Sequence, residues 1–119
     1  MDPKLRAWIV FEGGTKFGEG RAELLRRVDE EGSLNRAVKA MGMSYRAAWG
    51  YVAELEAAAG FALLERDASG ARLTSEGRAF LAAFERFRAR VEEAAATAFA
   101  EEFPAAREVP VSRAGPPAT

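Results

Sequence analysis

The strongest constraint on the fold of this chain lies in its first half, where two helical patterns follow each other almost without a linker. The first pattern spans residues 34–41, between a possible N-cap at Ser33 and a stop at Gly42. The second begins after Ser44, whose hydroxyl can also accept an unpaired backbone N–H, and runs to about Ala59. The sequence therefore predicts two short helices joined by a three-residue turn.

Both predicted helices have one apolar face. Their apolar residues recur at helical spacings and are Leu34, Ala37, Val38 and Met41 in the first helix, and Ala48, Val52, Leu55 and Ala59 in the second. Two helices joined by a tight, glycine-containing turn form a helix-turn-helix.

The segments on either side extend this unit. Alternating strand-forming residues predict a hairpin over roughly residues 7–18, with Gly13-Gly14 as a two-residue turn. The segment GRAELLRRVDEEGS then predicts a helix. After the second motif helix, FALLER and ARLT predict two short strands around RDASG. The predicted fold is mainly α with small β: a winged helix-turn-helix with an N-terminal β-hairpin and a long C-terminal helix.

The last helix is predicted to mediate dimerisation. Thr74 is its expected N-cap, with Gly77 tolerated in its first turn, and its apolar residues repeat at alternating spacings of four and three, as in the a/d seam of a coiled coil. This stripe could be intramolecular core, but it runs past what a small domain can cover, so a dimer seam is the better interpretation. The predicted interface residues are Leu24, Leu25, Phe80, Phe84, Phe87 and Val91.

The chain of 119 residues is long enough for one domain. We assign residues 1–103 to this domain. Residues 104–119 hold four of the five prolines and no apolar period, which predicts a disordered Pro/Ala-rich tail.

The composition argues against an enzyme. The chain has no histidine and no cysteine, and its spacing brings no pair of carboxylates together for acid–base work. We expect no metal and no cofactor. There is no apolar run long enough for a membrane span and no signal-peptide pattern, so a cytoplasmic protein with no membrane partner is expected.

The charge distribution separates one surface from the rest. A net charge of −1 and a pI of about 5.6 argue against a nucleic-acid partner for the chain as a whole. Between residues 33 and 52, however, Arg36, Lys39 and Arg46 occur with no acidic residue at all. Because a carboxylate there would repel a phosphate backbone, this surface is typical of DNA binding.

The N-terminal half of the second motif helix is the expected reading element. With Ala48 and Val52 facing the core, the residues at 45, 46, 49 and 50 lie mostly off it, in the part of such a helix that enters the major groove. Arginine can bond guanine with two parallel hydrogen bonds. The candidate DNA-binding residues are Arg36, Lys39, Ser44, Tyr45, Arg46, Trp49, Gly50, Arg66, Ser69 and Arg72.

Several of these assignments have a structural alternative. Trp49 is equally compatible with packing against the wing or first helix and with a phosphate or base contact. The ring of Tyr45 can pack while its hydroxyl reaches a phosphate. Arg36 and Lys39 fit non-specific phosphate contacts better than base contacts, and Arg66 is either a wing contact to the DNA backbone or a structural residue.

Four short motifs resemble one family. Gly32-Ser33, Ser44-Tyr45-Arg46-x-Ala48-Trp49, Leu64-x-Arg66 and Leu73-Thr74-x-x-Gly77 together resemble the DNA-binding domain of the molybdate-responsive ModE-type regulators, which are relatives of the LysR-type winged-helix domain. The resemblance spans roughly residues 7–99 and implies sequence-specific binding to double-stranded DNA as a homodimer, on a near-palindromic operator. The wing, RDASGA, is shorter than is common in that family, and no oxyanion-binding domain follows the long helix. Molybdate sensing is therefore not expected of this chain.

A different class of function is also compatible with the sequence. A winged-helix protein–protein adaptor that has lost DNA binding would explain the acidic pI, whereas the acid-free surface opposes it. Salt-dependent retention on duplex DNA would distinguish the two.

Overall fold

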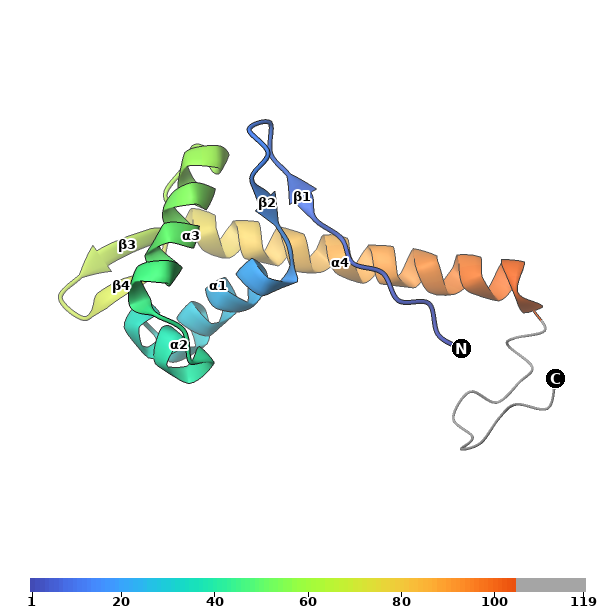
Figure 1. Cartoon of the computed structure of the whole chain (residues 1–119), viewed down its shortest axis with the longest axis horizontal. Coiled ribbons are helices and arrows are strands. Elements are labelled where there is room, and N and C mark those ends of the chain that lie inside the picture. Colours follow the sequence, from blue (N-terminus) through green and yellow to red (C-terminus); the bar gives the residue numbers. More distant parts are fainter. Residues whose placement is uncertain (105–119) are drawn as a thin grey trace.

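The helix-turn-helix is formed as the sequence predicts. The computed structural model describes residues 1–104, so the predicted tail falls, beyond Pro104, outside the described residues. Helices α2 (Leu34–Met41) and α3 (Tyr45–Ala59) follow each other across the turn (Figure 1). The hydroxyl of Ser33 accepts a hydrogen bond from the backbone N–H of Arg36 at 3.2 Å, and that of Ser44 accepts one from Ala47 at 2.9 Å. Both predicted caps are confirmed.

The N-terminal hairpin differs from the prediction in its turn. Strands β1 (Ile9–Val10) and β2 (Lys16–Phe17) pair antiparallel, but Phe11 donates to the carbonyl of Thr15 at 2.9 Å, so the connection is longer than two residues. A two-residue turn of the expected type needs positive φ at both central residues. Only Gly14 has it, at +94°. The prediction of a Gly13-Gly14 turn is therefore wrong in detail.

The remaining elements complete a winged helix. Helix α1 (Glu19–Glu31) precedes α2, and strands β3 (Leu64–Asp67) and β4 (Gly70–Leu73) form the predicted antiparallel wing. Helix α4 (Ser75–Glu102) follows and extends well beyond the other elements (Figure 1). No helix within residues 1–104 combines the length and apolar character that a membrane span requires.

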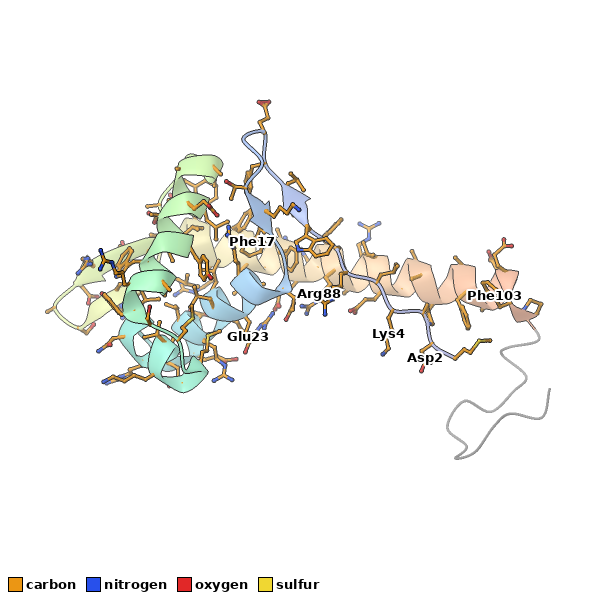
Figure 2. The ribbon with its side chains drawn as sticks, viewed as in Figure 1. Asp2, Lys4, Phe17, Glu23, Arg88 and Phe103 are labelled. Carbon is orange, nitrogen blue, oxygen red and sulfur yellow. The ribbon has the colours of Figure 1, made fainter. Side chains whose placement is uncertain are left out.

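The core lies between the three helices α1, α2 and α3, the hairpin, the buried residues of the wing strands and the first half of α4. Phe17 of β2 is fully buried, and its ring packs edge-on against Phe80 at 4.8 Å and Phe84 at 4.9 Å between centroids (Figure 2). Aromatic pairs favour this edge-to-face geometry. The hairpin thus covers the apolar stripe of α4 within the same chain.

This packing corrects part of the predicted dimer interface. Leu24, Leu25 and Phe84 are at most 4% exposed, and Phe80 is half-buried against Phe17 and Phe61, so all four belong to the chain's own core. The a/d spacing predicted the apolar stripe of α4 correctly, but it does not determine which element packs against that stripe.

Gly77 has a stronger role than the sequence suggested. Thr74 caps α4 as predicted: its hydroxyl accepts the N–H of Gly77 at 2.8 Å and donates to the carbonyl of Ala62 at 2.7 Å. A Cβ on Gly77 would lie 2.5 Å from the carbonyl oxygen of Leu63. Glycine is required here, not merely tolerated, because the start of α4 packs directly against the backbone of Leu63, just before the first strand of the wing.

Charged side chains join α1 to α4 on the surface. Arg26 pairs with Glu23 and Glu85, and Arg88 pairs with Glu19. Figure 2 labels Glu23 and Arg88. A hydrogen bond from the Arg27 guanidinium holds the pKa of Glu23 below its usual value, and the charge of Arg26 adds to the effect. These contacts fix the junction from which the rest of α4 projects.

The projecting part of α4 carries the exposed end of the seam. Phe87 is 40% exposed and Val91 is half-buried, and both follow the covered residues of the stripe. The N-terminal arm runs beside this region (Figure 1). Leu5 and Trp8 of the arm line a hollow together with Val91. Trp8 packs on Gly18, where a Cβ would lie 2.5 Å from its ring.

Candidate nucleic-acid interface

The first two turns of α3 present cationic and aromatic side chains and no acid. Tyr45 and Arg46 are exposed, whereas Ala48 is fully buried and fixes the orientation of the helix on the core. The first carboxylate of α3, Glu54, is engaged with Arg21 of α1 at 2.6 Å. The exposed N-terminal half of α3 is therefore free of negative charge, as the sequence predicted.

The N-terminus of α3 also offers backbone donors. The cap at Ser44 occupies the N–H of Ala47 with its hydroxyl and that of Ala48 with its carbonyl, at 2.9 and 3.1 Å. The N–H groups of Tyr45 and Arg46 precede the first intrahelical bonds, so they stay open toward solvent. A helix start with open N–H groups favours an anion such as phosphate.

The preceding helix adds two cations. Arg36 and Lys39 are exposed on α2, away from its buried face of Leu34, Ala37 and Val38. Arg36 makes one long contact with the backbone carbonyl of Glu31, at 3.4 Å.

Four cations without an ion pair within residues 1–104 lie on this part of the molecule. Ion pairs within residues 1–104 use Arg21, Arg26, Arg27, Arg72, Arg78 and Arg88. Across the helix-turn-helix and wing, Arg36, Lys39, Arg46 and Arg66 take part in none of them. Their positive charge is therefore not neutralised by neighbouring carboxylates of the described chain.

Trp49 lies beneath a side chain of the wing. The guanidinium carbon of Arg66 lies 4.8 Å from the centroid of the Trp49 ring, and Tyr45 meets the same ring edge-on at 6.2 Å. Trp49 is half-buried, and its indole nitrogen is fully buried. This geometry supports the packing alternative for Trp49 over direct contact through its N–H.

The wing separates two of the predicted site residues onto opposite faces. Arg66 is opposite the buried Ala71 in the strand register, whereas Arg72 is opposite Glu65, so the two arginines point to different sides. Arg72 pairs with Asp67 at 3.0 Å. The assignment of Arg72 to the same binding surface as Arg46 is therefore corrected: a strand alternates its side chains, and Arg72 falls on the face turned away from α3.

Ser69 lies at the exposed tip of the wing and organises the loop. Its backbone N–H and its hydroxyl both donate to a carboxylate oxygen of Asp67, at 2.8 and 2.6 Å. These hydrogen bonds, with the charge of Arg72, hold the pKa of Asp67 below its usual value. Within the described chain, the Ser69 hydroxyl therefore stabilises the loop at the tip of the wing.

Gly50 is placed in the open on the exposed side of α3. No atom of the described chain lies within 4 Å of where its Cβ would be, and its φ is not positive. Neither packing nor backbone strain within the described chain requires a glycine, although glycine weakens a helix interior. The missing side chain leaves room for close approach from outside.

Comparison with known proteins identifies this arrangement. Residues 21–78, from α1 through the cap of α4, match the family described as bacterial regulatory helix-turn-helix protein, lysR family. Within these residues the chain is similar to LysR-type winged helix-turn-helix domains. The family and fold are those of regulatory DNA-binding domains, not of enzymes.

A curated relative shows the same similarity. The chain is 36% identical over 76 residues to the molybdenum transport protein ModE of Azotobacter vinelandii. The match covers 60% of this chain. The match spans 28% of the length of ModE. The predicted resemblance to ModE-type and LysR-type domains is confirmed.

Two solved structures share the fold of the LysR-type domain. A complex of the CbnR DNA-binding domain with DNA matches with a TM-score of 0.56 and 28% identity, over 70% of this chain and 95% of that chain. CbnR, a LysR family transcriptional regulator, matches with a TM-score of 0.55 and 28% identity, over 68% of this chain and 28% of that chain. The predicted mainly α winged-helix architecture is confirmed.

Sequence reasoning left two features of the site unspecified. Packing of Trp49 against the wing was one of the alternatives, but its partner, Arg66, was not identified. The second is the separation of Arg66 from Arg72, for which the alternation of buried Leu64 and exposed Glu65 was an available signal.

Proposed function

We propose that this protein is a sequence-specific transcription regulator of the cytoplasm that binds double-stranded DNA as a homodimer, on a near-palindromic operator. The observation that carries the proposal is the set of unpaired cations around the acid-free N-terminal half of α3. The LysR family match and the fold shared with a DNA-bound CbnR domain support it. Residues 1–103 form the DNA-binding unit in this proposal.

Arg46 carries the base contact. It is exposed on the first turn of α3, and its guanidinium can donate two parallel hydrogen bonds to guanine in the major groove. The small exposed Gly50 lets the helix approach the bases closely. Tyr45 borders the same surface, with its hydroxyl available to a phosphate.

Phosphate contacts supply most of the affinity. Two groups of donors contact the DNA backbone on either side of the major groove. They are the side chains of Arg36 and Lys39 on α2 and the open backbone N–H groups that follow Ser44. Contacts of this kind release counterions, so binding weakens steeply as salt rises.

The homodimer uses the projecting half of α4. Phe87, which is 40% exposed, and the half-buried Val91 continue the apolar stripe beyond the residues buried in the chain's own core. Two copies joined there place one α3 on each half-site, which explains the expected symmetry of the operator.

The alternative is a winged-helix adaptor that binds protein and no DNA. Its support is the net charge of −1 together with the exposed apolar side chains of Leu5, Trp8 and Val10. It does not explain why the cations of α2 and α3 lack partners. Molybdenum appears in the name of the ModE relative alone, and we propose no role for molybdate here.

Selection of bound duplexes from a random pool tests the proposed function. The expected result is an enriched near-palindrome whose half-sites are about one helical turn apart. Arg46→Ala should change the enriched bases. Arg72→Ala should leave them unchanged, because it removes one positive charge from the face of the wing that is turned away from α3. A pool without enrichment, together with retention on DNA that does not respond to salt, would favour the adaptor.

A further inference from the structure

The contact between Trp49 and Arg66 joins the two parts of the proposed interface. Trp49 belongs to the second turn of α3 and Arg66 to strand β3. The guanidinium lies over the indole at 4.8 Å, within the range of a cation–π contact. Tyr45, one turn earlier on α3, packs against the edge of the same ring. The position of Arg66 is therefore set by α3 and not by the wing alone.

The hydrogen-bonding edge of Arg66 remains unused. Its side chain is exposed and takes part in none of the ion pairs formed within residues 1–104. The carboxylates nearest to it in sequence, Glu65 and Asp67, belong to the other face of the strand, where Asp67 is engaged by Arg72. The contact with the Trp49 ring holds the guanidinium in place, and no ion pair within residues 1–104 occupies its N–H donors.

The choice of tryptophan indicates that its ring face matters. The indole N–H of Trp49 is buried and has no hydrogen-bond partner among the described residues. A buried donor without a partner is unfavourable, and phenylalanine would pack a similar ring without one. Tryptophan, however, offers the strongest aromatic face for a cation. Because its N–H is inaccessible, Trp49 cannot donate to DNA and acts through the side chain it supports.

We propose that Trp49 is a positioning residue for Arg66, and that the stacked pair holds the guanidinium ready for a DNA phosphate beside the groove that α3 enters. The inference rests on the proposed function. A planar guanidinium matches the geometry of two phosphate oxygens, and stacking reduces the freedom it loses on binding. The contact contributes affinity and register, but no base preference.

The test is a double-mutant cycle measured as a function of salt. The full chain and the variants Arg66→Gln, Trp49→Leu and their combination are titrated with the selected operator and with an unrelated duplex. Arg66→Gln should weaken both complexes about tenfold and reduce the slope of log K against log salt by about 0.9, the value of one phosphate contact. Trp49→Leu should produce nearly the same losses, and the double variant should be no worse than either single one.

Two further variants separate positioning from general folding. Trp49→Phe retains a ring face and should recover most of the affinity and slope, whereas Arg66→Lys retains the charge but not the planar fork and should recover less. Arg72→Gln, on the other face, should leave the slope unchanged. Thermal melts show whether each variant is folded. If Trp49→Leu does not fold, the cycle is run with Trp49→Phe. This variant should lose less DNA affinity, and it should cause no further loss when Arg66 is already replaced by Gln.

The possible failures are distinguishable. A wild-type chain that binds neither duplex overturns the proposed function itself. A wild-type chain that binds, with folded Trp49 variants whose losses simply add to that of Arg66→Gln, overturns the positioning role. An unchanged salt slope in Arg66→Gln overturns the phosphate contact. A loss confined to the operator would show that Arg66 contacts a base and not a phosphate.

Discussion

At the scale of single residues, Arg46 is the side chain on which the proposed specificity depends most. We expect Arg46→Ala to weaken operator binding by about 1–3 kcal/mol, as for the loss of one two-point base contact. The free energy of unfolding should change by no more than about 0.5 kcal/mol, because the side chain is exposed and away from the core. Fluorescence anisotropy with labelled operator measures the first quantity and denaturant titration the second. Unchanged affinity would remove Arg46 from the assigned role.

Gly50 should show opposite effects on stability and on binding. Gly50→Ala adds a methyl group that meets nothing within the described chain, so the higher helix propensity of alanine should stabilise the fold by up to about 1 kcal/mol. The same methyl would intrude on DNA packed against α3, and we expect a binding loss of about 1–3 kcal/mol, as for an overfilled contact. A melting curve and an operator titration on one preparation measure both. Equal affinity would mean that DNA does not approach α3 at this point.

At the scale of elements, the start of α4 depends on Gly77. Gly77 lies against the backbone of its own chain, whereas Gly50 faces open space. Gly77→Ala would place a Cβ 2.5 Å from the carbonyl oxygen of Leu63, against backbone that cannot easily yield. The expected cost is about 1–3 kcal/mol of unfolding free energy, which outweighs the gain in helix propensity. Gly50→Ala is the matched control, since both are glycines in helices. A Gly77→Ala variant as stable as the wild type would show that the start of α4 can move away from the wing.

The ion pairs that Glu23 makes with Arg26 and Arg27 within α1 should respond to acid. The pKa of Glu23 is lowered in the folded chain, so its contribution is fully present above the ordinary value of 4.5 and is lost as the pH falls through the lower folded value. Glu23→Gln should therefore destabilise the protein at neutral pH but much less in acid. Denaturant titrations of both proteins at neutral pH and below pH 4.5 compare these losses. A loss that does not depend on pH would show that Glu23 acts through packing alone.

The elements differ in how far the sequence could predict them. The caps at Ser33, Ser44 and Thr74 depend on neighbours a few residues away, so local patterns found them, and with them the exposed half of α3. The contact of Gly77 with Leu63 and the covering of Phe84 by Phe17 join distant segments, and no local spacing encodes them. Arg66 and Arg72 are an intermediate case, because strand alternation separates them but only the fold shows which side faces α3.

At the scale of the whole molecule, the exposed part of the α4 stripe is the test of assembly. Phe87→Glu should yield a folded monomer, because Phe87 is 40% exposed and contributes little to the core of one chain. DNA affinity should fall sharply with it, since a single half-site is a weak target. Sedimentation at tens of micromolar, a range in which ordinary dimers persist, measures the change.

Phe84→Glu provides the contrast for that experiment. Phe84 is 4% exposed and packs on Phe17, so a buried carboxylate there should unfold the chain instead of separating two folded copies. A wild-type chain that sediments as a monomer would reject the interface, as would a Phe87→Glu variant that remains dimeric.

Helix α4 runs without interruption for 28 residues from the cap beside the wing, and this continuity has a consequence for operator geometry. Each residue advances the helix by about 1.5 Å, so a contact point moved by one heptad shifts by about 10 Å. In a two-fold dimer the crossing moves along both helices, so the separation of the two copies of α3 changes by up to about 20 Å, more than half of the 34 Å repeat of the duplex. Two copies that crossed one heptad away would therefore meet DNA out of phase, with the second half-site rotated toward the far side of the double helix. The crossing point along α4 thus determines how many base pairs separate the half-sites.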